Sequence, residues 1–276
     1  MARLILFTQN TMASVVASRI LLQRHPQEIV AVVIANQFRG ESLRQQLKVI
    51  RTLTRKSSWE FFFYKLLESK LYNVLLTAHR MLRTSSYRSG KAQSIEEWAR
   101  KQEIPVLTAA DLNAPAFLEQ IKNLKPDYIL CLIAQILRQE SFAALGKKFI
   151  NAHGSYLPEY RGPAQYFWYL LDGRKEFGVT VHFMEPGLDT GEIIFQKKIP
   201  FSPPISAYRL HYLLARKFGE LLSEFVTQYA PLSPIPTQKQ DESKATHTRL
   251  PTREDLRQFH AQGHRLVTGK DFLTGI

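Results

Sequence analysis

The sequence predicts an α/β domain built on a mostly parallel β-sheet. Two continuous apolar runs, at residues 4–7 and 29–35, are typical of strands that are covered on both faces. Residues 13–23 between them have the apolar spacing of a helix, so the chain begins as a strand–helix–strand unit. The same rhythm returns after residue 94, and we place both parts in one domain, residues 1–201.

Local patterns justify the later elements of this domain. Ser94, followed three residues later by Glu97, has the pattern of a capping box at the start of a helix. Residues 179–184 and 193–199 alternate apolar and polar side chains more clearly, which predicts an antiparallel pair. The other expected strands are 105–107, 128–134 and one that begins at Phe149, and the expected helices are 94–102 and 115–124.

A basic, aromatic segment at residues 39–101 interrupts the α/β pattern after the second strand. It contains 14 Lys and Arg against 5 Asp and Glu, and so carries +9 of the net charge of +13. Residues 41–83 have a helical composition without Gly or Pro. Apolar side chains at spacings of three and four predict one apolar helix face, formed by Trp59, Phe62, Phe63, Leu66, Leu71, Val74, Leu75, Ala78 and Leu82.

The sequence leaves several uses of this helical insertion open. Its apolar stripe fits packing against the domain or against a second subunit. Its basic, amphipathic character also fits a membrane surface or a protein partner. An RNA-binding arm is a further use, because clustered Lys and Arg attract phosphates. Nucleic acid is less favoured as a partner, since the apolar content of the segment is high.

Residues 202–276 are expected to form a small, mainly helical C-terminal extension. Apolar residues at helical spacing predict a long helix over 207–229. Pro231, Pro234 and Pro236 then interrupt regular structure. Thr252 begins a last short helix, which we expect to end before Gly263.

The composition limits the class of protein. A net charge of +13 in 276 residues suits an anionic substrate, a nucleic acid or an anionic membrane surface. The N-terminus lacks a secretory pattern and no apolar stretch reaches about 18 residues, so we expect a cytoplasmic protein, with binding at a membrane surface as an alternative. The single cysteine, Cys131, lies in an apolar run and is expected to be a buried thiol. No residue spacing indicates a metal site.

Three polar residues stand where a ligand site is expected. Asn151 and His153 are two positions apart in a strand, so both side chains point to one side where that strand ends. Asp189 lies between glycines in the loop that joins the last two strands. An amide and a protonated imidazole can stabilise an oxyanion, and a carboxylate can orient the imidazole or accept a proton. The set fits acyl transfer to an amine, although each residue alone also fits a structural role.

A longer motif surrounds these three residues. It consists of Asn-x-His-x-Ser-x-Leu-Pro-x-x-Arg-Gly from residue 151, a Gly-Val-Thr strand from residue 178, and Gly-Leu-Asp-Thr-Gly from residue 187. This pattern resembles the signature of the 10-formyltetrahydrofolate-dependent formyltransferases, which include methionyl-tRNA, glycinamide ribonucleotide and sugar-nucleotide N-formyltransferases. The resemblance implies a Rossmann-like formyltransferase domain with 10-formyltetrahydrofolate as formyl donor. It also implies that Asn151, His153 and Asp189 are the catalytic residues.

The resemblance further implies where the folate binds. Its pterin would contact backbone groups after the strand that precedes the catalytic one, and a second loop would close the pocket. The matching residues are Ala134, Gln135, Ile136, Leu137, Glu185, Gly187 and Leu188. Residues 8–14 lack a dinucleotide fingerprint, which argues against a nicotinamide cofactor.

The acceptor implied by the resemblance is an amine on a small or glycosyl-type molecule, such as an amino-sugar nucleotide. Methionyl-tRNA is the alternative within the family, but residues 202–276 begin with a long helix instead of the barrel expected of a tRNA enzyme. Another alternative is a catalytically silent member that acts as a binding protein through residues 39–101. The intact Asn151, His153 and Asp189 argue against that alternative.

Overall fold

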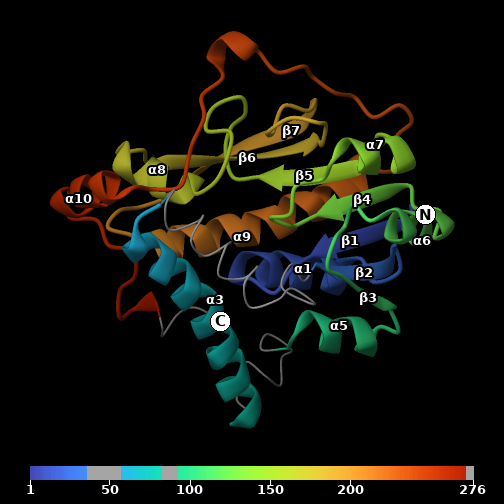
Figure 1. Ribbon diagram of the computed structural model, residues 1–276, viewed down its shortest axis with the longest axis horizontal. Helices are drawn as coiled ribbons and strands as arrows, with labels where there is room; N and C mark the ends of the chain where they lie inside the picture. The colour runs from blue at the N-terminus through green and yellow to red at the C-terminus, as the bar shows by residue number, and fades with distance from the viewer. Residues whose placement is uncertain (36–56, 83–92, 272–276) are drawn as a thin grey trace.

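The computed structural model describes residues 1–35, 57–82 and 93–271, and one seven-stranded sheet forms its centre (Figure 1). The strands are β1 (Leu4–Thr8), β2 (Ile29–Ala35), β3 (Val106–Ala109), β4 (Tyr128–Cys131), β5 (Phe149–His153), β6 (Glu176–Phe183) and β7 (Ile193–Pro200). Their order in the sheet is β3-β2-β1-β4-β5-β6-β7. The pairs among β1 to β5 are parallel, whereas β6 is antiparallel to both β5 and β7. The predicted α/β class with a mostly parallel sheet is confirmed.

Helices connect most of these strands. They are α1 (Met12–Arg24), α3 (Trp59–Met81), α5 (Ile95–Lys101), α6 (Pro115–Asn123), α7 (Gln139–Leu145), α8 (Gln165–Leu171), α9 (Ala207–Glu224) and α10 (Arg253–Ala261). The capping box predicted at Ser94 is present at the start of α5. The sequence did not predict α7 and α8, which have seven residues each. Two turns are too short to establish a helical period, and α8 is apolar on every side.

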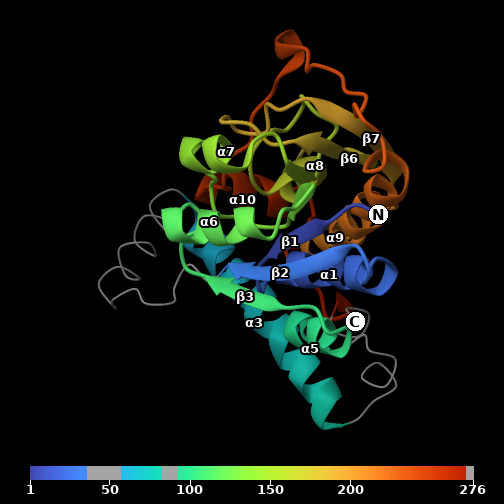
Figure 2. The same ribbon diagram turned by 90° about the vertical axis from the view of Figure 1, so that its right-hand side faces the viewer.

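Helices cover both faces of the sheet, which explains the continuous apolar runs. Along β1, Leu4 and Leu6 face one core, and Ile5 and Phe7 face the other. The first core contains α1 and α9, whereas α6 and α7 cover the second (Figure 2). Because side chains on both faces are buried, the strands lose the polar alternation of a half-exposed sheet.

The helix expected in the C-terminal extension is α9, and it is central to the fold. It lies along α1, where a Cβ added to Gly219 would lie 2.8 Å from the carbonyl oxygen of Ala17. The missing side chain at this position therefore allows the two helices to approach closely. A π-helical turn, Phe225–Tyr229, continues α9. The expected division of the chain at residue 201 stays a prediction.

Helix α3 lies in the predicted insertion, but it packs by a different face from the expected one. Trp59, Phe63 and Val74 of the predicted stripe are 53%, 59% and 61% exposed. Phe61 and Tyr72, which lie outside that stripe, are buried in the main core. The prediction that the stripe packs against the domain is therefore wrong for these residues. Because α3 carries apolar side chains on both faces, periodicity selects the larger stripe and not the buried one.

The remaining expectations for the insertion stay predictions. Residues 36–56 and 83–92, which contain much of its positive charge, lie outside the described residues. Contacts of the insertion with a second subunit, a membrane surface, a protein or RNA are therefore not tested. Within the ranges that the structure describes, no helix combines the length and the apolarity needed to cross a membrane.

An extended segment, residues 238–248, passes over the loops that follow β5 and β6 before the chain reaches α10 (Figure 1). We call it the C-terminal strap. Gln238 pairs with Ile193 at the start of β7, and His247 pairs with Arg161. Apart from these isolated pairings, residues 202–271 contain helices and turns but no strand. The mainly helical character predicted for this region is confirmed over that range.

Candidate active site

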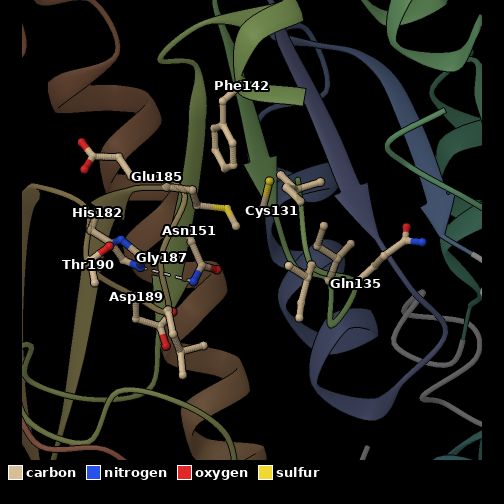
Figure 3. A pocket seen from close by; sticks show the side chains of 14 residues that line it. Cys131, Gln135, Phe142, Asn151, His182, Glu185, Gly187, Asp189 and Thr190 are labelled. Carbon is tan, nitrogen blue, oxygen red and sulfur yellow. Dashed lines mark hydrogen bonds between the residues drawn. The ribbon is translucent and has the colours of Figure 1, made fainter. Parts of the chain in front are cut away.

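A cavity of about 140 Å³ lies at the carboxyl ends of β4 and β5, beside the loop between β6 and β7 (Figure 3). Ligands of open α/β sheets bind at this edge. The wall combines apolar side chains with a few polar ones. Its residues are Cys131, Ile133, Gln135, Ile136, Leu137, Phe142, Asn151, His182, Met184, Glu185, Gly187, Leu188, Asp189 and Thr190.

The structure brings nearly all of the sequence-predicted site residues together. Six of the seven residues matched to pterin binding line this cavity, and Ala134 lies beside it in the same loop. Asn151 and Asp189 also line it. His153 does not, because its side chain is buried behind the cavity wall and only 6% exposed. The two predicted groups of residues therefore share one site.

His153 and Asp189 meet although 35 positions separate them in the chain. The imidazole Nδ1 lies 3.4 Å from Asp189 Oδ2, and Nε2 lies 3.1 Å from the carbonyl oxygen of Tyr160, to which it can donate. The backbone N–H of Gly162 donates to the same carboxylate oxygen over 2.9 Å. The loop after β5 and the loop after β6 are thus joined at the predicted catalytic residues.

The Gly-Val-Thr part of the motif has a structural role beside this site. Thr180 Oγ1 donates to the carbonyl oxygen of Ser155 over 2.7 Å and accepts from the N–H of Leu157 over 3.1 Å. A Cβ at Gly178 would overlap the backbone nitrogen of Tyr156. Strand β6 therefore holds the chain that leaves β5, and only glycine at position 178 leaves room for it.

Sequence reasoning missed His182, which pairs directly with Asn151 across β5 and β6. Burial lowers the pKa of His182 to about 4, so the ring is neutral near pH 7. Its Nδ1 lies 2.7 Å from the carbonyl oxygen of Phe183, which assigns the proton to Nδ1. Nε2 is then an acceptor, and Asn151 Nδ2 donates to it over 3.3 Å. His182 thus determines the orientation of the Asn151 amide.

A signal for His182 exists in the sequence. Thr180 and His182 are the polar residues at alternate positions of a strand whose other members, Val179, Val181 and Phe183, are apolar. This alternation places Thr180 and His182 on one side of β6. Their partners on β5 are His153 and Asn151, but that register appears only in the paired sheet.

Asn113 shapes the loop that follows β4. Its amide nitrogen donates to the carbonyl oxygen of Ile136 over 3.1 Å, and its amide oxygen accepts from the N–H of Arg138 over 2.6 Å. Gln135 extends away from Asn151 (Figure 3) and bonds to the backbone of Ala110 and Leu112. The Gln135 amide is therefore engaged with the backbone of Ala110 and Leu112 and not with the cavity.

Cys131 is the buried thiol that the sequence predicts. It is 1% exposed at the end of β4, and burial raises the pKa of its thiol. A raised pKa keeps the sulfur protonated and unreactive. Among the described residues, no group of three or more His, Cys, Asp or Glu side chains has the geometry to hold a metal ion. The polar side chains in the cavity wall are those of Gln135, Asn151, His182, Glu185, Asp189 and Thr190.

The chain is similar in sequence to a known family of proteins. The family model described as formyl transferase matches residues 74–226, more than half of the chain. The methionyl-tRNA formyltransferase of Chlorobium chlorochromatii is 31% identical over 200 residues, which cover 71% of this chain and 63% of that protein. The enzyme of the same name from Caldanaerobacter subterraneus is 34% identical over 162 residues, covering 58% and 52%. The chain thus spans about half to two thirds of the length of these curated relatives.

Solved structures of related enzymes share the fold. Glycinamide ribonucleotide transformylase 1 from Symbiobacterium toebii has a TM-score of 0.57 at 16% identity, covering 87% of this chain and 95% of that one. An N-formyltransferase from Helicobacter canadensis, solved with folinic acid and dTDP-3-aminofucose, has a TM-score of 0.55 at 20% identity, covering 92% and 72%. The fold is the Rossmann-like one expected from the motif. With a family match over more than half of its length, the chain belongs to the formyl transferase family.

Proposed function

We propose that the protein is an N-formyltransferase that moves a formyl group from 10-formyltetrahydrofolate to an amine. The observation that carries this proposal is that Asn151 and Asp189 line the same cavity as residues 135–137 and 185–188. The first pair would act on the reacting atoms, and the two loops would hold the pterin. Membership of the formyl transferase family supports this class of reaction.

The cavity suits a flat ring with a hydrogen-bonding edge. Ile133, Leu137, Phe142 and Met184 supply apolar surface, and such surface packs against the faces of a ring. Backbone groups of the 134–137 loop would meet the edge of the pterin, because the Gln135 amide is bonded to Ala110 and Leu112. The Helicobacter canadensis enzyme, which shares the fold, was solved with folinic acid.

The residues of the site have distinct roles in this reaction. Bound 10-formyltetrahydrofolate supplies the formyl group, whose carbon bonds to the amine nitrogen as its bond to the folate nitrogen breaks. The Asn151 N–H that does not face His182 donates to the formyl oxygen as charge develops there. Asp189 accepts the proton that the amine loses, directly or through water, and passes it to the departing folate nitrogen. The Gly162 N–H and His153 Nδ1 hold Asp189 in place, at 2.9 and 3.4 Å from its Oδ2.

A small or glycosyl-type amine, such as an amino-sugar nucleotide, is the acceptor that we favour. Residues 202–271, the described residues that follow β7, form helices and the strap. The net charge of +13 suits an acceptor that carries phosphates.

Methionyl-tRNA is the second candidate acceptor. The two relatives at 31% and 34% identity are both methionyl-tRNA formyltransferases. The same net charge also attracts a polyanion. Formylation of methionyl-tRNA at a kcat/KM above that of every small amine would decide for this candidate.

The experiment that tests the function measures tetrahydrofolate release from 10-formyltetrahydrofolate. Three acceptors are compared: dTDP-3-aminofucose, glycinamide ribonucleotide and methionyl-tRNA. Formylation of the acceptor is verified by mass spectrometry. Binding of folinic acid is measured in parallel, so that a folded protein with the wrong acceptor is recognised. If the protein binds folinic acid but wild type and Asp189→Ala are equally inactive with all three acceptors, the enzymatic proposal fails.

Asn151→Ala tests the role of the amide. We expect kcat to fall by about 10²- to 10³-fold, as the loss of one oxyanion donor commonly causes. The dissociation constant of folinic acid should change little, because the loops 134–137 and 185–188 remain intact. Steady-state kinetics and a binding titration check both statements. An unchanged kcat would remove Asn151 from this role.

A further inference from the structure

One side chain of the strap, Gln240, bonds to both loops that border the candidate site. Its amide nitrogen donates to the carbonyl oxygen of Asp189 over 2.8 Å and to that of Gly191 over 2.7 Å. Its amide oxygen accepts from Nε and Nη2 of Arg161 over 3.2 and 2.7 Å. Two of these bonds are to the loop that contains Asp189, and two are to the loop that follows Asn151 and His153. The neighbours of Gln240 in the chain, Lys239 and Asp241, are exposed, so the inward direction is specific to this residue.

Asp189 has a backbone conformation that needs such support. Its φ is +55°, in the left-handed region that residues other than glycine seldom adopt. A residue in this region persists only where its surroundings hold it. The Gln240 amide bonds to the carbonyl of Asp189 itself and to the carbonyl two residues later. These bonds act on the peptide groups that set the direction of the Asp189 carboxylate.

Arg161 anchors Gln240 from the opposite side. The guanidinium is 2% exposed and also donates to both carboxylate oxygens of Glu242, over 2.8 and 2.6 Å. Backbone bonds join Arg161 to Thr246 and Thr248 of the strap. A Cβ at Gly162 would lie 2.7 Å from the carbonyl oxygen of Thr248. The strap therefore packs against Arg161 and Gly162 of the motif. The Gly162 N–H also donates to the Asp189 carboxylate.

We infer that Gln240 is a positioning residue of the catalytic centre. Held by Arg161, its amide fixes the carbonyls of Asp189 and Gly191 and so places the Asp189 carboxylate against His153. The inference rests on the proposed function for its catalytic meaning. It goes beyond that function because it makes a residue of the C-terminal strap part of the site.

Gln240→Glu separates this role from simple attachment of the strap. A carboxylate keeps the acceptor for Arg161, but it has no N–H for the two loop carbonyls and repels them. We expect the backbone amide hydrogen of Gly162, which donates to Asp189 Oδ2, to exchange about tenfold faster, because the loss of both Gln240 bonds lets the carboxylate move away from it. We expect kcat and kcat/KM to fall together by about 10- to 100-fold, because a small displacement of a catalytic group has this effect.

Glu242→Gln is the matched control. It weakens the other attachment of Arg161 and leaves the Gln240 amide in place. Glu242 is 67% exposed, and the amide oxygen of a glutamine at this position still accepts from the Arg161 guanidinium. Exchange of the Gly162 amide and kcat should therefore stay within about twofold of wild type. A merely structural strap predicts the opposite order, with Glu242→Gln impaired and Gln240→Glu close to wild type, and that result would overturn the inference.

The readouts separate this inference from the proposed function. Hydrogen exchange requires no acceptor, and kcat is measured with the same three acceptors as above. If wild type transfers no formyl group but Gln240→Glu accelerates exchange of the Gly162 amide, the function fails and the positioning of the Asp189 loop stands. If exchange and kcat are both unchanged in a folded Gln240→Glu protein, the inference fails whatever the reaction is.

Discussion

A neutral histidine orients the amide on which the proposed oxyanion stabilisation depends. His182 is 1% exposed, and its Nδ1 lies 2.7 Å from the carbonyl oxygen of Phe183. A protonated ring would present two donors, and Asn151 would have to turn its oxygen toward His182. The N–H directed at the formyl oxygen would then be lost. The low pKa of His182 therefore has a functional consequence as well as an energetic one.

His182→Gln tests how the low pKa of His182 affects the free energy of unfolding. Burial lowers the pKa of His182 from 6.5 to about 4, so its contribution to stability is complete above pH 6.5 and is lost as the pH falls toward 4. The full effect corresponds to about 3 kcal/mol. A glutamine does not titrate, so the free energy of unfolding should fall less steeply over this interval than in wild type. Urea unfolding at several pH values measures the slopes.

Other buried histidines also contribute to the pH dependence of the free energy of unfolding. Burial also lowers the pKa of His25 and of His211, so some pH dependence will remain in the variant. Replacement of the exposed His247 by Gln is the control and should leave the wild-type slope unchanged. Equal slopes for His182→Gln and wild type would mean that His182 does not titrate in this range.

At the scale of elements, β6 supports the loop that contains the motif. The strand bonds to Ser155 and Leu157 through Thr180, and Gly178 lies against Tyr156. Gln196 of β7 adds a bond from its amide nitrogen to the carbonyl oxygen of Leu157 over 2.8 Å. The antiparallel end of the sheet thus fixes the chain between His153 and Arg161.

Gly178→Ala should disrupt this support. The new methyl group would overlap backbone atoms of Ser155 and Tyr156, which cannot move as a side chain end can. We expect a loss of about 3 kcal/mol in the free energy of unfolding, at the upper end for overpacking, measured by urea unfolding. Gly269→Ala is the control, because nothing lies within 4 Å of its added Cβ. A Gly178→Ala protein as stable as Gly269→Ala would contradict the packing described here.

At the scale of the molecule, a buried charged cluster attaches α3 to the domain. Glu68 of α3 is 3% exposed and forms ion pairs with Lys65 of the same helix and His211 of α9. The His211 ring stacks on Tyr166 of α8, with ring centroids 4.3 Å apart. Burial alone would raise the pKa of Glu68, but the charge of Lys65 and the hydrogen bond with His211 hold it at about 2. The insertion is therefore joined to α8 and α9 through one ionised carboxylate.

Glu68→Ala should weaken this attachment strongly. Removal of one partner from a buried ion pair leaves the others without compensation, which costs about 3–5 kcal/mol. Glu60→Ala is the control, because its ion pair with His260 is largely exposed and contributes at most about 1 kcal/mol. Urea unfolding and limited proteolysis of both variants measure the difference. Equal stability of the two variants would mean that the cluster does not hold α3.

Local sequence patterns determined the class of fold and the main elements of the site. The apolar runs at 4–7 and 29–35 became the central strands β1 and β2, because a buried parallel strand needs apolar side chains on both faces. The motif from Asn151 to Gly162 and the loop 187–191 predicted the location of the cavity, whose wall includes residues of both. Ligand-binding polar residues at the carboxyl end of a strand follow from chain geometry, which a sequence contains.

The tertiary structure alone decided the contacts between distant segments. His182 meets Asn151 through the register of two strands, and Gln240 reaches the carbonyl of Asp189 from 51 positions away. The buried face of α3 was likewise set by its neighbours, and Trp59, Phe63 and Val74 of the larger apolar stripe stayed exposed. The apolar spacing of a segment shows which faces it has, but not which other segment packs against them. The sequence therefore determined which residues form the site, and packing determined which residues hold them in place.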